Sequence, residues 1–242
     1  MASPKEESKE VVVEVKESVE NYSAVESFIE DPLAQVEDAY SKYKKPLNFL
    51  GTAVLAVIVL FAGWKYYIGT QEEEANTQMF QSVYYFEADS LAKALNGDGN
   101  YPGLIEIADD YSLTPSGNLA KFYVGTTYLK QGKFEEAITY LKGFSSNDLL
   151  VQARAYSLIG DANMELKQYD EASSYYSKAS NYKPNKEFTP VYLMKLGLAQ
   201  EKASNLEDAL ETYSNVLEQY PNSSVSNDAK RNKGVVEAQL GK

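Results

Sequence analysis

The chain has 242 residues, which is enough for one or two domains with a hydrophobic core, and its formal net charge is −12. It contains no histidine and no cysteine, which excludes Ser–His and Cys–His nucleophile pairs, imidazole or thiolate metal sites and disulfide bonds. Nucleic-acid binding requires clustered positive charge, and this acidic composition argues against it.

Residues 1–45 form an acidic segment, and we predict disorder over its first ten residues. Two short apolar stripes at helical spacing follow: Val25, Phe28 and Ile29, and then Val36, Tyr40 and Tyr43. A dedicated docking motif is the alternative interpretation, but charge runs are most often solvated. We therefore interpret the segment as a solvated tail, partly helical and partly disordered.

Residues 46–68 are predicted to span a membrane as one helix. No charge occurs between Phe49 and Trp64, and extension to Ile68 gives about the 20 residues that a helix needs to cross the hydrocarbon layer. Trp64 and two tyrosines stand at one end, where amphipathic rings favour the interface. A cleaved signal peptide is excluded by the long acidic lead and the lack of a small-residue cleavage site. A buried core helix would be amphipathic, whereas this stretch is apolar all round.

The lysines that flank the span predict its orientation. Lys42, Lys44 and Lys45 precede the apolar stretch, and only Lys65 follows it closely. Positive residues favour the cytoplasmic side. We therefore predict a single-pass protein with a cytoplasmic N-terminus and everything after residue 70 on the far side.

Residues 69–117 are predicted to hold a linker helix and a degenerate repeat, the repeat covering residues 74–112. Met79, Val83, Phe86 and Leu91 follow a helical rhythm. Residues 96–100 break that rhythm, a short helix is expected over residues 104–111, and residues 112–117 are expected to turn again. No strand-like alternation appears after residue 70, so the predicted fold class is all-α.

Residues 118–242 repeat one pattern around Gly125, Gly160 and Gly197, with a partial fourth copy at Gly234. The glycines lie 35, 37 and 37 residues apart, close to the period of a helix–turn–helix repeat. The remaining positions are Tyr128, Gly132, Phe134, Ala137 and Leu141 in the first unit, Tyr156, Tyr169, Ala172, Tyr176, Ala179 and Pro184 in the second, and Leu193, Leu196, Leu206, Ala209, Tyr213, Val216 and Pro221 in the third. We predict an α-solenoid of helix hairpins that residues 227–240 cap.

Small residues explain how such hairpins close. We expect Gly160 and Ala172 to mark the crossing of two antiparallel helices, and Ala179 to let the next repeat dock. Tyr169 and Tyr176 would fill the wedge between helices with their hydroxyl groups reaching water. A sugar- or base-stacking platform is the alternative for the tyrosines, but aromatics at helical spacing are usually core.

Three departures from the pattern affect the predicted packing. Extra residues at 185–189 and 222–226 predict lengthened loops, and Pro184 is expected to end the preceding helix. The first unit lacks a closing proline. It also carries Phe144 where a small residue is usual, which brings its docking onto the second unit into question.

The repeats resemble the tetratricopeptide repeat over about residues 118–242. In that family the first helices line a concave groove. The resemblance implies groove positions at Leu119, Phe122, Thr126 and Leu129, then Arg154, Ser157, Asp161 and Met164, and then Val191, Met194, Leu198 and Glu201. The lysine/asparagine clamp that grips acidic chaperone termini is absent here. The groove would suit an extended or helical peptide; the alternatives are a solvated groove or one filled by the chain's own helix.

The order of an anchor followed by repeats resembles the YfgM-like inner-membrane proteins of Gram-negative bacteria. The stretches "YVGTTYLKQGKFEEAITYLKGF" and "YPGLIEIADDYSLTPSGNLA" carry this resemblance. It implies an accessory subunit of the Sec translocon that holds a membrane-anchored periplasmic chaperone or emerging substrates. The long acidic tail departs from the family. An adaptor for cell-wall or division machinery is the alternative, and an enzyme has the least support, because the chain has no glycine-rich phosphate loop and no paired-carboxylate motif.

Overall fold

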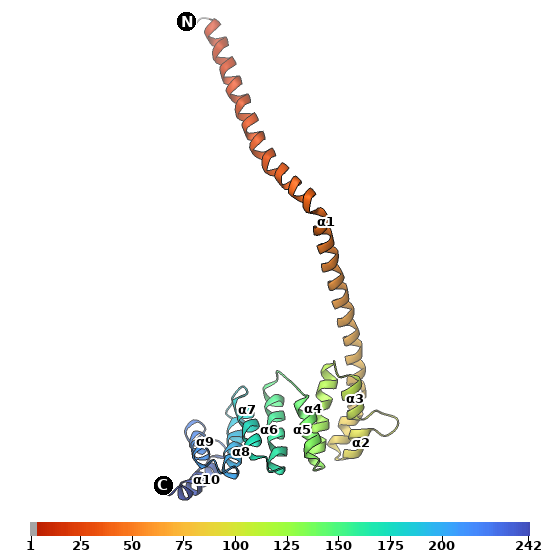
Figure 1. Cartoon of the computed structure of the whole chain (residues 1–242), viewed down its shortest axis with the longest axis vertical. Helices are drawn as coiled ribbons and strands as arrows, with labels where there is room; N and C mark the ends of the chain where they lie inside the picture. Colours follow the sequence, from red (N-terminus) through yellow and green to blue (C-terminus); the bar gives the residue numbers. More distant parts are fainter. Residues whose placement is uncertain (1–3) are drawn as a thin grey trace. The chain divides into compact units, whose positions relative to one another are not determined.

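The computed structural model describes the backbone of residues 4–242 and the side chains of residues 16, 36 and 40–242. The chain divides into two compact units, residues 1–65 and residues 66–242. Within the described residues every regular element is a helix (Figure 1), which confirms the all-α prediction.

Helix α1 runs from Pro4 to Glu87 and contains the apolar stretch. The part from Tyr40 to Glu87 is long and apolar enough to cross a membrane, and none of its apolar window is buried. Full exposure of apolar side chains is unfavourable in water, so this part of the helix is compatible with a single-pass anchor. The stripe at residues 25–29 falls outside the described side chains and remains a prediction, whereas α1 includes residues 4–10, within the segment for which we predicted disorder.

Nine further helices follow α1 in the unit formed by residues 66–242. They are α2 (Leu91–Asn96), α3 (Leu104–Asp110), α4 (Pro115–Lys130), α5 (Phe134–Lys142), α6 (Leu149–Glu165), α7 (Tyr169–Asn181), α8 (Thr189–Lys202), α9 (Leu206–Gln219) and α10 (Ser226–Gln239). Short loops join them, and α4–α5, α6–α7 and α8–α9 form successive hairpins (Figure 1).

Two predicted boundaries between residues 69 and 117 are wrong. Leu91 does not continue the helix of Met79, because α1 ends at Glu87 and Asp89 adopts a φ of 55° in the turn that follows. Residues 115–117 do not turn but open α4. Thr114 caps that helix by accepting a hydrogen bond from the Gly117 backbone N–H, and Pro115 occupies its first turn, where its missing N–H costs nothing.

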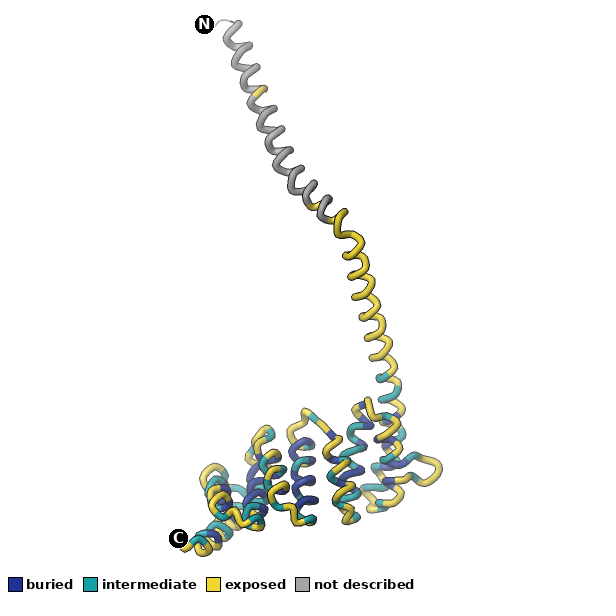
Figure 2. The backbone as a smooth tube through the Cα atoms, in the orientation of Figure 1, coloured by how far each residue is buried: buried dark blue, intermediate teal, exposed yellow. Residues whose placement is uncertain are grey.

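The last part of α1 packs into the start of the repeats. Met79 shares a buried cluster with Leu104 and Ile107 of α3 and with Val124 of α4. The Ser82 hydroxyl donates a hydrogen bond of 2.5 Å to the carbonyl of Pro102. Residues 72–110 therefore form the first packing layer of the array. Figure 2 shows buried positions in dark blue where the last part of α1 joins the repeats.

Helix α10 closes the other end of the array. Ala229 and Val236 are fully buried, and Val236 packs with Ala209 and Tyr213 of α9. Lys233 precedes Gly234, where the earlier repeats have the buried side chains of Ile159 and Leu196. A polar residue at this position suits a helix whose outer face meets water, which is what a terminal cap requires.

Candidate partner-binding face

In each of the three complete repeats, the aligned glycine lies against a large side chain of its own second helix. A methyl group added to Gly125 would lie 2.5 Å from Leu141, and one added to Gly160 would lie 2.5 Å from the ring of Tyr176. Gly197 stands in the same relation to Tyr213, also at 2.5 Å. Only glycine leaves room for these contacts.

The expected crossing of Gly160 with Ala172 remains a prediction, and the geometry adds the ring of Tyr176 to it. Ala172 is fully buried, but it packs in a cluster with Tyr176 and with Leu193 and Leu196 of α8. The ring of Tyr176, one turn further along α7, is what meets Gly160. Both positions lie on one face of α7, because residues four apart are neighbours on a helix.

The other small positions are also buried. Ala137, Ala179 and Ala209 expose 0%, 1% and 0% of their surface. Ala179 clusters with Ala153 of α6 and with Tyr192 of α8, so it lies where the next hairpin packs. Helix α7 ends at Asn181, before Pro184.

Phe144 strengthens the first junction instead of obstructing it. Its side chain is 6% exposed and clusters with Leu141 and with Ala155 and Leu158 of α6. Its ring lies 5.3 Å from that of Phe122, centroid to centroid. At this junction the large side chain fills the space between the hairpins, so the hairpins need not approach as closely as those that meet at a small residue.

The predicted groove positions lie on α4, α6 and α8, which together we call the first-helix face. On α4, the side chains of Leu119, Phe122 and Leu129 are half-buried, because they pack against the cluster of α5 and α6. Thr126 is also half-buried and donates its hydroxyl hydrogen to the carbonyl of Phe122. The α4 positions therefore contribute partly to the core.

The remaining positions differ in exposure. Arg154 and Leu198 are exposed, and Leu198 exposes 42% of its surface. Met164, Val191 and Met194 are half-buried apolar side chains. This part of the face offers apolar contact area around polar groups, with methionines that adapt to different partners.

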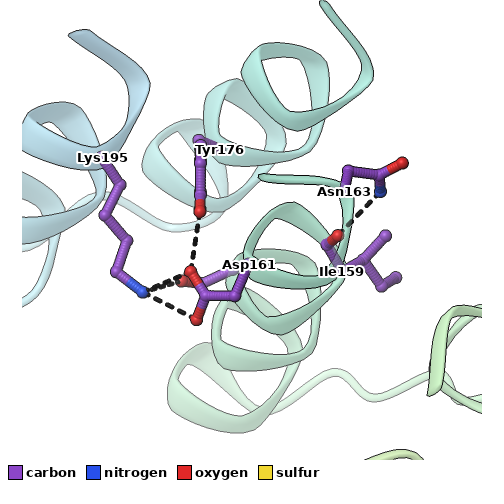
Figure 3. Close-up of polar contacts among 6 residues, drawn as sticks. Ile159, Asp161, Asn163, Tyr176 and Lys195 are labelled. Atoms are coloured by element: carbon purple, nitrogen blue, oxygen red, sulfur yellow. Dashed lines mark hydrogen bonds and ion pairs between the residues drawn. The ribbon is translucent and has the colours of Figure 1, made fainter. Parts of the chain in front are cut away.

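Asp161 is the centre of a polar cluster on the first-helix face (Figure 3). The Nζ atom of Lys195 lies 2.7 Å from one of its carboxylate oxygens and 2.8 Å from the other. The Tyr176 hydroxyl donates to the same carboxylate at 2.7 Å. Lys195 also donates to the Ser157 hydroxyl at 3.3 Å. We call Asp161, Tyr176 and Lys195 the α6–α8 node, because they tie two consecutive hairpins together.

A related node joins α8 to α10. The Tyr213 hydroxyl forms a short hydrogen bond with the carboxylate of Glu201 and accepts one from Asn232 at 3.5 Å. Asn232 stands two residues before Gly234, as Lys195 stands two residues before Gly197. The expectation that the tyrosine hydroxyls reach water is wrong for Tyr176 and Tyr213, whose hydroxyls bond to carboxylates.

Burial and negative charge raise the tyrosine pKa values at both nodes. Desolvation raises the pKa of Tyr176, and the Asp161 carboxylate raises it further. Desolvation also raises the pKa of Tyr213, with a second contribution from its hydrogen bond to Glu201. Each ring therefore stays neutral well above the pH at which an exposed tyrosine ionises.

Sequence reasoning placed Ser157 and Asp161 on this face but missed Lys195. The position two residues before each glycine holds Tyr123, Leu158, Lys195 and Asn232 in successive units, so no repeated residue type marks it. The detectable signal was the offset itself, with a polar residue in two units. Among the described residues, no group of three carboxylates is placed to hold a metal ion.

Comparisons with known proteins agree with this geometry. Two family models, both described as tetratricopeptide repeat, match residues 125–185 and 192–223. A Podosopora anserina protein with nearly identical TPR-like repeats, described as a candidate kinesin light chain, is similar over 70% of this chain and 88% of its own, with 12% identity and a TM-score of 0.54. MamA from AMB-1 is similar over 70% and 84%, with 13% identity and a TM-score of 0.51. No curated protein matches the sequence.

These similarities agree on the fold. The hairpins from α4 to α9 are tetratricopeptide-type repeats, an architecture that serves as a scaffold for protein–protein interaction.

Proposed function

We propose that this chain is a membrane-anchored, non-catalytic adaptor whose first-helix face holds a protein partner. One observation carries the proposal: an apolar stretch of α1, fully exposed, precedes tetratricopeptide-type hairpins in the same chain. The anchor confines the hairpins to the bilayer surface, and the hairpins supply an interaction face. The exposed Leu198 and Arg154 with the half-buried methionines make this face suited to an extended or helical peptide.

In the finer form of the proposal, the adaptor is an accessory subunit of the Sec translocon. It would sit in a bacterial inner membrane with residues 1–45 in the cytoplasm and the repeats in the periplasm. There it would hold a membrane-anchored chaperone or emerging substrates. The resemblance to YfgM-like proteins and the lysines before residue 46 support this form.

Site-specific crosslinking in native membranes tests the partner. A photo-crosslinking residue placed at Leu198 or Arg154 is expected to capture translocon or chaperone subunits. The matched controls are Ser174 and Glu211, which are exposed on the second helices α7 and α9. Recovery of cell-wall or division proteins alone from the first-helix positions would replace the Sec assignment with the envelope-assembly alternative.

A topology measurement tests the compartment independently of the partner. A reporter fused after Lys242 is expected to be active only on the periplasmic side. A cytoplasmic signal would end the periplasmic proposal whichever partner is bound.

A further inference from the structure

We infer that one edge of the repeat array rests on the lipid surface of the membrane that α1 spans. This inference rests on the proposed anchor and goes beyond it, because it assigns a second membrane contact to residues far from the span. The edge consists of the loops at residues 111–114, 143–148, 182–188 and 220–225, with the first residues of the helices that follow them. We call it the proximal edge.

Within the unit of residues 66–242, hydrogen bonds hold this edge to the part of α1 near Glu72. The Glu72 carboxylate accepts hydrogen bonds from the Ser116 backbone N–H and from the Ser116 hydroxyl, both at 2.8 Å. Glu72 thereby caps the N-terminus of α4, where negative charge is favoured. Ile68, the last residue of the predicted span, precedes Glu72 by four residues, or about 6 Å along a helix. The start of α4 is therefore held near the level at which the span ends.

The proximal loops then connect to one another along the array. The Asn118 side chain donates to the carbonyl of Ser145 at 2.8 Å, and the Tyr182 hydroxyl donates to the carbonyl of Ser146 at 2.9 Å. Lys186 and Asn222 line one cavity of about 620 Å³ between the last two proximal loops. Because the hairpins alternate in direction, these loops all lie on the same side of the array (Figure 1).

Exposed apolar side chains concentrate on this edge. Leu113 exposes 66% of its surface, and Leu149, Leu150 and Phe188 expose 42%, 45% and 41%. Between residues 111 and 242 the other large apolar side chains that are this exposed are Leu198 and Val235, which lie within α8 and α10, and earlier in the unit Phe80, Tyr84 and Tyr101 are also exposed. Leucine and phenylalanine at loop tips gain free energy when they enter the boundary between headgroups and acyl chains.

The opposite edge of the array has no large apolar side chain exposed to this extent. Its loops, at residues 131–133, 166–168 and 203–205, lead into the acidic first turns of α5, α7 and α9, which contain Glu135, Glu136, Asp170, Glu171, Glu207 and Asp208. The same edge carries Lys130, Lys133, Lys167 and Lys202, so charges of both signs occur there and what it lacks is exposed apolar side chains.

The proximal loops hold two acidic residues, Asp148 and Glu187, beside Lys183 and Lys186. Asp148 is engaged locally, since it accepts the backbone hydrogen bonds of Leu150 and Val151. The first turn of α10 adds Asp228, so the charge of this edge is mixed and the exposed apolar side chains are what favour its contact with lipid.

Spin labels on the full chain test the inference, because a chain without cysteine accepts one label per introduced cysteine. The full chain would be reconstituted in liposomes of phosphatidylethanolamine and phosphatidylglycerol. Labels at Leu113→Cys, Leu149→Cys and Phe188→Cys report on the proximal edge. Lys133→Cys and Gln168→Cys are the matched controls on the opposite edge, where both residues are exposed.

The expected result is a several-fold loss of collision with a water-soluble nickel complex at the three proximal labels, with collision by lipid-soluble oxygen retained. The effect should be largest at Leu113, which lies nearest to the Glu72 contact. The control labels should collide freely with nickel. Nickel access at the proximal labels equal to that of the controls would overturn the inference. Protection from both oxygen and nickel would also overturn it, because that pattern indicates burial against protein.

A fourth label separates this inference from the proposed anchor. Val57→Cys lies within the span and should be accessible to oxygen and protected from nickel. If Val57 reports the bilayer while Leu113 reports water, the anchor stands and the lipid-resting edge is wrong. If Val57 itself reports water, the anchor is wrong.

Discussion

The first junction of the repeat array, where the α4–α5 hairpin meets α6, and the second, where the α6–α7 hairpin meets α8, use the same backbone geometry with different side-chain chemistry. In the first junction, Leu141 covers Gly125 and clusters with Leu158 of the next hairpin, so the contact is apolar throughout. In the second junction, Tyr176 covers Gly160 and Lys195 takes the place of Leu158, so the contact ends in an ion pair with Asp161. The fold therefore requires a large side chain over each glycine, but the chemical character of the end of that side chain can differ between repeats.

Truncation at the apolar junction should have the largest effect on stability. Leu141→Ala removes a side chain that is 1% exposed and leaves a cavity against Gly125, so the free energy of unfolding should fall by about 2–5 kcal/mol. Urea unfolding of the full chain in detergent, followed by circular dichroism, measures it. Leu198→Ala, at an exposed site, is the control and should change stability by less than about 0.5 kcal/mol. Equal effects of the two variants would contradict the role of Leu141.

Replacing an aligned glycine with alanine should destabilise the chain where a side chain covers the glycine and should not where the glycine is open to solvent. Gly160→Ala forces the buried Tyr176 ring to move, and we expect a loss of about 1–3 kcal/mol in the free energy of unfolding. Gly234→Ala is the matched control, because nothing lies within 4 Å of its added methyl group. It should gain up to about 1 kcal/mol from higher helix propensity. A stabilising Gly160→Ala variant would show that the ring does not cover this glycine in solution.

How far the sequence predicts the junctions depends on what repeats in it. The glycine and the alanine at the positions of Gly160 and Ala172 recur in the three complete units, so their burial followed from the pattern. That the ring of Tyr176 covers Gly160 did not follow from the pattern, because Ala172 and Tyr176 lie on one face of α7 and the spacing does not show how far each side chain reaches. Lys195 escaped notice because its position changes chemistry from unit to unit.

The binding face was harder to predict than the packing for a physical reason. A residue on a first helix contributes to the core or to the surface according to the neighbouring hairpin, which the local sequence does not contain. Phe122 and Leu129, which are predicted to line the groove, are half-buried against the α5–α6 cluster, while Leu198, another predicted groove position, is exposed.

Alkaline pH should weaken the second and third junctions through Tyr176 and Tyr213, the tyrosines that cover Gly160 and Gly197. The pKa values of Tyr176 and Tyr213 are raised in the folded chain, so the rings stay neutral while those of the unfolded chain ionise above pH 10. The stabilisation is complete below pH 10 and is lost as the pH rises further, by about 1.4 kcal/mol per pH unit for each tyrosine. Unfolding measured from pH 8 to pH 11 tests this.

The Tyr176→Phe and Tyr213→Phe variants provide the control for the alkaline effect. Each variant should remove the contribution of one tyrosine to the pH dependence of the free energy of unfolding, because phenylalanine cannot ionise in either the folded or the unfolded state. The first junction has no titratable group at the equivalent position, Leu141. An unchanged slope in the double variant would assign the alkaline loss to other groups.

Replacing the ion pair with the residues found at equivalent positions should have the smallest net effect. Leu158 and Leu198 occupy the positions of Lys195 and Asp161 in neighbouring units, so the changes are Lys195→Leu and Asp161→Leu. Each single variant leaves one partly buried charge without its partner and should cost about 1–3 kcal/mol. The double variant removes both charges and should lie within about 1 kcal/mol of the original chain, because apolar packing often replaces a buried ion pair without loss. The coupling energy from this double-mutant cycle separates two explanations of the node. A large coupling energy with a neutral double variant means that the ion pair keeps the hairpins in register without adding net stability. Additive losses would mean that Asp161 and Lys195 act independently and that the polar junction is not the equivalent of the apolar one.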